Sequence, residues 1–285
     1  MRKMLISILV IAILAISMVP TAFSATNGDA VVLTYGETTY MNQNYKSLVD
    51  NYFLNKGFDT SNVQGEVITA ADVNAISSGI SGKTYNSNQI VSCALVDLTQ
   101  NNEITVEVDS SITTITPQMY ASALKSAGIT SGHVYVTSPV TATGESALAG
   151  IMNSYEEVTD VEIPENVKAA ANDEIYTEAA IVENSNVSSE DLSKLVDDVK
   201  EEVQEKNITD HDTIVNIIND YSTTYNINIS NSDIENLADS IEQIQLAQDD
   251  VNSYKEELGD VVNNTTDGFS LDGIFNAVLS VFNFG

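Results

Sequence analysis

Hydrophobic positions follow two different rhythms along this chain. Up to about residue 160, short stretches rich in β-branched and aromatic residues predict strands, and apolar residues three and four positions apart predict helices. After residue 161 only the helical spacing remains. We therefore predict an α+β protein, in which an N-terminal mixed α/β sheet domain precedes an antiparallel helical bundle. The predicted strands are 31–35, 66–69, 91–99, 104–108, 111–115 and 133–138, and the helices of this half are 42–55, 117–127 and 144–155.

Two local patterns indicate how the predicted strands connect. The polar tetrapeptide at 100–103 reads as a hairpin loop between strands 91–99 and 104–108. Pro117 at the first helical position and Gly128 just past the last delimit the following helix, which Thr116 is placed to cap. The strands at 111–115 and 133–138 flank this helix, so we expect a βαβ unit with a right-handed crossover.

The second half contains several helix start signals. They lie at Pro164, at Ser188, around 209–212 and at Ser232, where Ser-Asp-Ile-Glu forms a capping box. The last helix is expected to run long and to end at Gly259. We divide the chain into a mixed α/β domain at 25–162, a helical bundle at 163–262 and an apolar C-terminal tail at 263–285, preceded by residues 1–24.

Residues 1–24 have the three parts of a secretory signal peptide. Arg2 and Lys3 precede an apolar run over 4–19, and small residues lie at 22 and 24. The apolar run is shorter than the roughly 20 residues that span a bilayer comfortably. We expect cleavage after Ser24 and a protein that is secreted or associated with the cell surface; an uncleaved anchor would also place the rest of the chain outside.

Charge narrows the function classes. The chain has 41 acidic residues against 11 basic ones, a net charge of −30, and 25 of the acids follow residue 165. Without Arg2 and Lys3, only 9 Lys and no Arg remain. Such a surface repels nucleic acid and anionic lipid headgroups. We expect an acidic, solvated bundle, no cofactor, and at most diffuse binding of divalent cations.

The stretch from Gly144 to Ser146 resembles a nucleophile elbow. An elbow needs a strand that runs straight into the turn, but Pro139 closes the strand and position 148 is Leu instead of Gly. Helix packing explains the stretch better, because small residues recur on one face and Thr143 can cap the helix. These small residues are Thr143, Ala147, Gly150 and Ser154. A hydrolase that uses Ser146, or a pair of acids, stays the alternative.

Only two histidines are available for chemistry. His133 begins a strand and is expected to be structural. His211 lies between Asp210 and Asp212 in the first turn of a helix, where we expect a solvated residue beside the cap. A triad of Ser146, an Asp and His211 would follow the chain order of the α/β-hydrolases.

The sequence contains no complete metal-binding motif and no pair of cysteines for a disulfide. No His-x-x-x-His or cysteine cluster indicates zinc. Residues 226–237 begin like an EF-hand, but Asn231 replaces its glycine and Leu237 its final glutamate. The metal site therefore stays unknown. Cys93 is the only cysteine, which excludes an intrachain disulfide.

Five sequons and the tail are further features of the helical half. N-glycosylation would make the protein a glycoprotein; the alternative is that the sequons reflect composition. The tail segment 268–285 is apolar, too short to span a membrane, and contains no Lys or Arg. It either folds back on the bundle or contacts a membrane or partner protein. The sequon residues are Asn186, Asn207, Asn228, Asn263 and Asn264.

Several segments resemble the YpuA-like secreted family, a domain of unknown function. They include SCALVDLTQNNEITVEV, the stretch from ITPQMYASALKSAG to GIMNSYE, and AAANDEIYTEAAIVEN. The likeness covers most of residues 30–250 and is most specific at 116–157. It implies an exported protein and supplies no catalytic residues. Our leading interpretation is a non-catalytic binding or envelope-associated protein, whose partner would be a cell-envelope component or a surface protein; the alternative is the secreted hydrolase.

Overall fold

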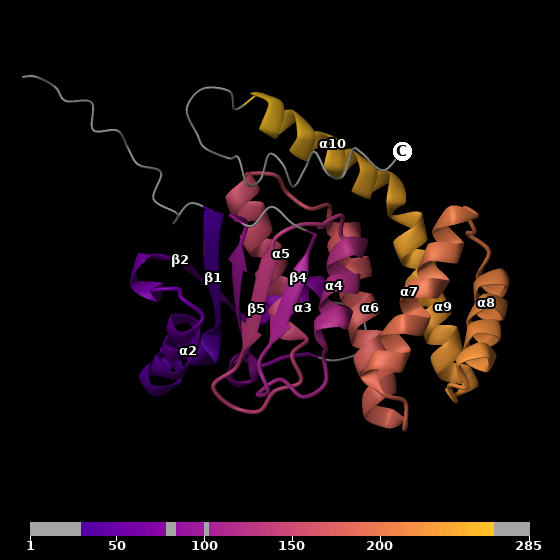
Figure 1. Cartoon of the computed structure of the whole chain (residues 1–285), viewed down its shortest axis with the longest axis horizontal. Helices are drawn as coiled ribbons and strands as arrows, with labels where there is room; N and C mark the ends of the chain where they lie inside the picture. The colour runs from indigo at the N-terminus through magenta and orange to yellow at the C-terminus, as the bar shows by residue number, and fades with distance from the viewer. Residues whose placement is uncertain (1–29, 78–83, 100–102, 265–285) are drawn as a thin grey trace, which may run out of the picture.

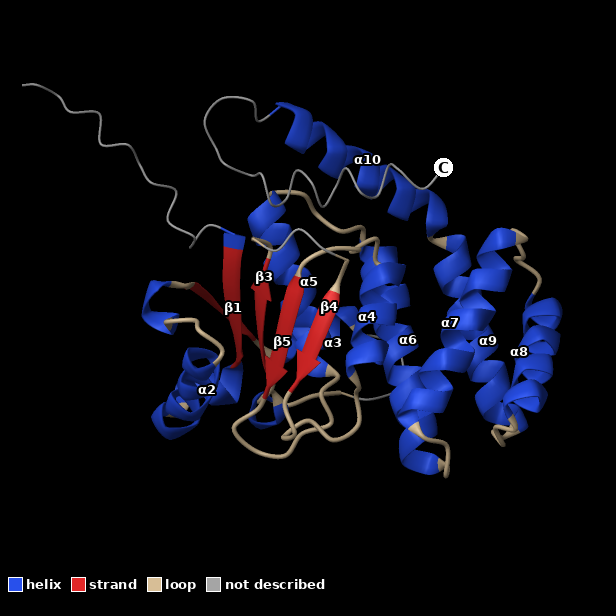
Figure 2. Ribbon diagram, in the orientation of Figure 1, coloured by secondary structure: helices blue, strands red, loops and turns tan. Residues whose placement is uncertain are grey.

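The computed structural model describes residues 30–77, 84–99 and 103–264 (Figure 1). The predicted signal peptide at 1–24 and the tail segment at 268–285 lie outside the described residues. Within these ranges, no helix is both long enough and apolar enough to cross a membrane. The predicted α+β class is confirmed, with a mixed sheet in the first half and helices after it (Figure 2).

The sheet is mixed, with strand order β2-β1-β3-β5-β4 in the described part of the chain. β1 runs parallel to β2 and antiparallel to β3, β3 is antiparallel to β5, and β5 is parallel to β4. The strands are β1 (Val31–Gly36), β2 (Gln64–Ile68), β3 (Cys93–Asp97), β4 (Thr105–Val108) and β5 (His133–Thr137).

Both faces of the central strands are buried, which explains their continuous apolar sequences. Alternate residues of β1 and β3, including Leu33 and Leu95, pack against α2 (Gln43–Asn55). The intervening residues of β3 and β5, including Val96 and Val134, belong to a second core beneath the helices of the opposite face. The sheet is therefore the middle layer between α2 and the helices that contribute to this second core.

The predicted hairpin does not form, and the βαβ unit begins at a different strand from the one predicted. β3 and β4 are not neighbours, because β5 lies between them. Residues 111–115 form only an isolated bridge, and the crossover into β5 starts from β4 instead. Asp109 is the reason: its carboxylate accepts from Ser111 N at 3.0 Å and its carbonyl accepts from Ile112 N at 2.9 Å, so a turn ends the strand.

Helices of the first half follow their cap residues. Thr116 accepts from Met119 N and Pro117 opens α4 (Pro117–Ser126), as predicted. Asn42 caps α2, and Thr69 caps α3 (Ala70–Ile76), a helix that the hydrophobic pattern did not predict. The expected cap Thr143 was wrong: it precedes α5 (Ser146–Thr159) and donates to the Glu145 carboxylate. The short α1 (Glu37–Met41) follows β1 directly.

The bundle helices also begin at caps, with one correction. Ser188 and Asp210 cap their helices as expected, but the cap of α9 is Ser230, two residues before the predicted Ser232. The predicted long helix is two helices, because α9 ends at Leu246 and a new helix begins at Gln248. The helices are α6 (Glu165–Asn184), α7 (Ser189–Glu205), α8 (His211–Tyr225), α9 (Asn231–Leu246) and α10 (Gln248–Asn264).

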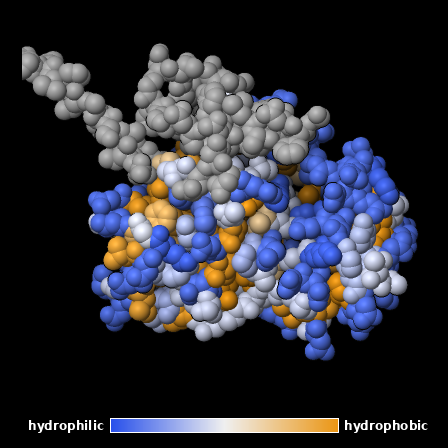
Figure 3. All heavy atoms as spheres, viewed as in Figure 1, coloured by the Kyte–Doolittle hydropathy of each residue, from blue (hydrophilic) through white to orange (hydrophobic). Residues whose placement is uncertain are grey.

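One continuous core joins the sheet to part of the helical half. It includes α4 and α5, the inner face of α6, and Val251 and Tyr254 of α10. A separate core holds α7, α8 and α9 together. α10 accordingly runs back from the bundle over the sheet side (Figure 1). Hydrophilic residues cover most of the visible bundle surface (Figure 3).

The close approach at Gly144 gives a test of the fold. Gly144 has φ +113, and a Cβ there would lie 2.7 Å from the Tyr120 hydroxyl and from a methyl group of Ile112. Gly57 has φ +100 with nothing within 4 Å of such a Cβ. We expect Gly57→Ala to lower the free energy of unfolding by about 1–2 kcal/mol through backbone strain alone. Gly144→Ala should lower it by about 1–3 kcal/mol more, because its Cβ would also clash with Tyr120 and Ile112. Urea unfolding of the two variants measures the difference; equal losses would contradict the packing.

Candidate functional site

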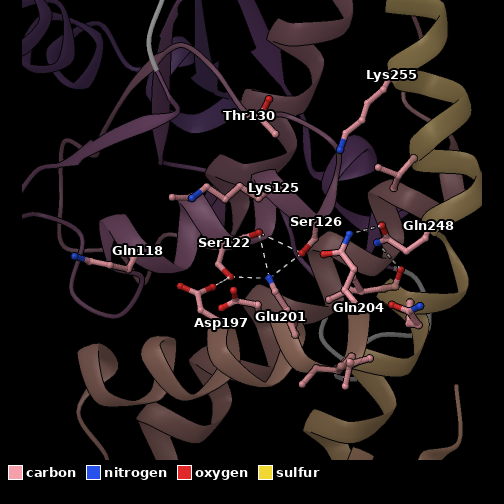
Figure 4. Close-up of a pocket in the computed structure, with 17 residues that line it drawn as sticks. Gln118, Ser122, Lys125, Ser126, Thr130, Asp197, Glu201, Gln204, Gln248 and Lys255 are labelled. Atoms are coloured by element: carbon pink, nitrogen blue, oxygen red, sulfur yellow. Dashed lines mark hydrogen bonds between the residues drawn. The ribbon is translucent and has the colours of Figure 1, made fainter. Parts of the chain in front are cut away.

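A cleft with a volume of about 560 Å³ lies where the sheet domain meets the bundle (Figure 4). Side chains of α4, α7, α9 and α10 form its walls. Three of the nine Lys outside the first 24 residues line it, beside several hydroxyl and amide groups. Two carboxylates, Asp197 and Glu201, line the same cleft, so its lining is less acidic than the chain as a whole, whose net charge is −30.

A buried ionic network forms one wall of the cleft. Lys200 Nζ on α7 lies 2.5 Å from Glu174 Oε1 on α6, and the two side chains are 16% and 1% exposed. The same ammonium donates to Ser122 Oγ at 2.7 Å and to Ser126 Oγ at 2.9 Å, both on α4. All three N–H groups of Lys200 therefore have acceptors. α4 and the two consecutive helices α6 and α7 therefore meet at one cation.

Two further carboxyl groups make this network strongly acidic. Ser122 Oγ lies 2.5 Å from Asp197 Oδ1 and 2.7 Å from Glu174 Oε1, although its one proton can be donated to only one of them. Glu178 is fully buried nearby, and its Oε1 has no hydrogen-bond partner among the described residues. Burial, and next the charge of Glu174, raise the pKa of Glu178 well above its usual range. The surroundings of Glu178 therefore favour its neutral form.

Lys200 is not available as the base of a serine nucleophile in this network. A serine nucleophile needs an adjacent base that can take its proton. Lys200 instead donates to Ser122 and is paired with Glu174. Removing one partner from such a buried ion pair typically destabilises a protein by about 3–5 kcal/mol. The network therefore fixes one wall of the cleft, and the ammonium groups of Lys125 and Lys255 lie outside it.

Lys255 is the cation that the network leaves available. It reaches from α10 toward the wall that carries Thr130 and Ser126 (Figure 4). Among the described residues it has no hydrogen bond and no ion pair, and burial lowers its pKa. Lys125, on the opposite side, pairs with the exposed Glu103 at 3.0 Å. Lys255 is thus a partly buried cation without a carboxylate partner.

Ser146 lies away from this cleft, at the start of α5. Its side chain is 7% exposed, and residues 138–145 separate β5 from α5, so no strand runs into the turn. The predicted close packing of α5 on the sheet is confirmed, because a Cβ on Gly150 would lie 2.5 Å from Thr34 Oγ1 of β1. The small residues therefore serve the contact between helix and strand.

The two histidines occupy separate ion-pair sites. His133 Nε2 lies 3.1 Å from Glu107 Oε1, and its ring stacks on Tyr135 with a centroid distance of 4.3 Å. We expected His211 to be a solvated residue beside the helix cap. Instead, carboxylates of α9 surround its ring. α8 packs on α7 and α9 whereas α5 packs on β1 and β3, so the structure does not bring His211 and Ser146 together.

Acidic side chains gather around a second hollow. Glu66 of β2 lies beside Glu157 of α5, and burial, together with the charge of Glu157, raises the pKa of Glu66. Glu66 and Glu157 form one of several close pairs of acids in the described part of the chain. Further carboxylates line the same hollow, whereas Lys168 is its one basic lining residue among those described, and it pairs with Glu156 at 3.1 Å.

The sequons follow the connections between bundle helices. Asn186, Asn207 and Asn228 are exposed, after α6, α7 and α8 respectively. Ser188 and Ser230, the third residues of two sequons, are helix caps, and the residue between Asn and Ser packs on the bundle core. The need for a core residue followed by a capping serine between two helices thus accounts for the Asn-x-Ser pattern at these two positions. Glycan attachment stays a prediction. The side chains of the last two sequon residues, Asn263 and Asn264, are not among those that the structure describes.

Comparison with known proteins places the chain in a family. A family model described as "Protein of unknown function (DUF1002)" matches residues 35–261. The chain belongs to this family. It is similar to "Uncharacterized protein YpuA" of Bacillus subtilis (strain 168), with 26% identity over 304 aligned residues that cover 99% of this chain and 100% of that protein. No solved structure matches. The resemblance found in the sequence is therefore confirmed.

The sequence contained a signal for the network that the pattern analysis missed. Val167, Ala171, Glu174 and Glu178 form one stripe of α6 at helical spacing, so two carboxylates interrupt an apolar face. Buried acids on such a face require partners. Their partners come from α4 and α7, and spacing within one helix cannot identify them.

The pKa of Glu178 predicts a pH-dependent stability difference. A carboxyl whose folded pKa is raised contributes stability below its unfolded pKa of about 4.3 and loses it as the pH rises through the folded pKa. Ionised Glu178 would face Glu174 of α6 and Asp197 of α7, with Lys200 as the attractive charge. We expect Glu178→Gln to raise the Tm by roughly 3 °C or more at pH 8 and by little at pH 4.5.

The exposed Glu183 on the same helix provides the control for calorimetry. Glu183→Gln should change the Tm by the same small amount at both pH values. If the effect of Glu178→Gln also stays constant between pH 4.5 and pH 8, Glu178 is not a buried neutral acid.

Proposed function

We propose that this chain is an exported, non-catalytic binding protein whose cleft between α4, α7, α9 and α10 receives a small polar ligand with one anionic group. The observation that carries the proposal is Lys255. In a chain with 41 acidic residues, a partly buried ammonium lacks a carboxylate partner among the described residues. A buried cation without a partner is costly, and an anionic ligand would remove that cost.

The rest of the lining supports a polar ligand. The side chains of Gln118, Gln204, Gln245 and Gln248 surround the cleft together with the hydroxyl of Thr130. Amide side chains both donate and accept hydrogen bonds, so they suit amide or hydroxyl groups of a ligand. The high negative charge of the whole protein disfavours a polyanion. A molecule with a single carboxylate and several amides fits these constraints.

The export part of the proposal is supported by the N-terminal sequence. Arg2, Lys3, the apolar run over 4–19 and the small residues before Ala25 have the composition of a cleaved signal. The acidic bundle would then act as a spacer or assembly element outside the cell, and the tail segment 268–285 would contact a membrane or a partner protein. Partners would be cell-envelope or surface molecules.

Two matched probes test the cleft. Acetyl-Ala-Ala has a terminal carboxylate and two amides, whereas acetyl-Ala-Ala-amide has the same shape without the charge. We expect only the acid to shift the NMR signals of Gln248 and Thr130, with a millimolar Kd. Lys255→Met should weaken this binding by about tenfold or more, because the charge-assisted hydrogen bond is lost.

Lys194→Met is the matched control, since Lys194 is exposed on α7 and lies 4.6 Å from the ring centroid of Tyr225, outside the cleft. It removes the same charge from the chain and should leave the acid's Kd unchanged. Equal shifts with both probes, or equal weakening by both variants, would contradict an anion site at Lys255.

A further inference from the structure

A second group of polar side chains lies between α8 and α9, away from the cleft. α9 presents Glu235, Asp239 and Glu242 at positions i, i+4 and i+7, which lie on one helix face. His211, the first residue of α8, is the side chain that faces them. Among the described residues, no lysine forms an ion pair with any of the three carboxylates.

The contacts of the two ring nitrogens of His211 differ. Nε2 lies 3.0 Å from Glu235 Oε2, within hydrogen-bond geometry. Nδ1 lies 3.3 Å from Asp239 Oδ1 and 3.3 Å from Glu242 Oε2. Nδ1 is inaccessible to solvent, and neither contact meets hydrogen-bond geometry. When Nε2 carries the only proton, Nδ1 directs a lone pair toward the two carboxylate oxygens. A positive charge between them, either a second proton on Nδ1 or a metal ion, makes that arrangement favourable.

The distances fit a particular cation. Zinc binds imidazole nitrogen at about 2.0–2.1 Å and carboxylate oxygen at about 2.0–2.2 Å, so ligand atoms of a tetrahedral site lie about 3.3–3.5 Å apart. Both Nδ1–oxygen distances, at 3.3 Å, match this edge, and all three candidate ligand atoms lie within 4.8 Å of one another. We propose that His211, Asp239 and Glu242 bind one Zn²⁺, which joins the start of α8 to α9.

Glu235 supplies the outer partner that such a site needs. A histidine that binds a metal usually donates its other N–H to a carboxylate, which fixes the tautomer and the ring orientation. The hydrogen bond from Nε2 to Glu235 has this role and leaves Nδ1 for the metal. The fourth position of the tetrahedron is left to water, since Asp239 is exposed. The nitrogen ligand distinguishes this site from the diffuse calcium binding that carboxylates alone provide.

The test is a zinc titration of the full mature chain without an affinity tag, followed by isothermal titration calorimetry. Excess Ca²⁺ is present throughout, because it occupies surface carboxylates without favouring imidazole. We expect one Zn²⁺ per chain, and a Tm that rises by roughly 5–10 °C at a hundredfold excess over the Kd and falls back with EDTA. Co²⁺ in place of zinc should give the visible absorption of a tetrahedral site.

The variants separate this site from general acidity. His211→Ala should abolish the saturable event, and Glu235→Gln should weaken it by about 10- to 100-fold. His133→Ala removes the other histidine, whose ring nitrogen faces Glu107, and should bind as the wild type does. Glu242→Gln is the second ligand variant if His211→Ala misfolds. Unchanged zinc affinity in the ligand variants, or no saturable zinc binding by the wild type, would overturn the proposal.

Discussion

The ion pair between Lys200 and Glu174 is the interaction on which the arrangement of this protein depends. It brings together α4 of the sheet domain, α6 and α7, and it is almost fully buried. Buried charges are tolerated only when every group has a partner, and loss of one partner typically costs about 3–5 kcal/mol. The two serines of α4 complete the coordination of the ammonium. Separating the sheet from the helical half would therefore expose these charges to solvent or remove their hydrogen-bond partners.

The cleft is a consequence of this junction. Lys200 pairs with Glu174 and Lys125 with Glu103, so Lys255 of α10 is the lysine of the cleft that has no carboxylate partner among the described residues. α10 holds this position because Val251 and Tyr254 pack into the same core as the sheet helices. The ionic network thus makes one wall of the cleft rigid, and the apolar packing of α10 positions the ammonium of Lys255. The distal helices α7, α8 and α9 have a core of their own, to which the zinc site would add a polar joint.

The sequence predicts local features better than their partners. Caps such as Thr116, Ser188 and Asp210 lie where local chemistry requires them, and the two hydrophobic rhythms predict the α+β class correctly. The strand order was missed because β5 lies between β3 and β4, and the hydrophobic periodicity of each strand does not indicate which strands pair. The cleft and the histidine cluster depend on contacts across 24 or more positions, so no spacing within one helix reveals them.

Crosslinking from the cleft on living cells shows whether the exported chain binds a partner molecule there. A photoreactive amino acid in place of Gln245, which lines the cleft, is compared with one at Gln243, which is exposed on the same helix and does not line it. The account predicts that the recovered chain begins at Ala25 and lies outside the cell. It also predicts one reproducible adduct from position 245 that Lys255→Met removes. A chain that retains residue 1 inside the cell, or identical adducts from both positions, would contradict the account.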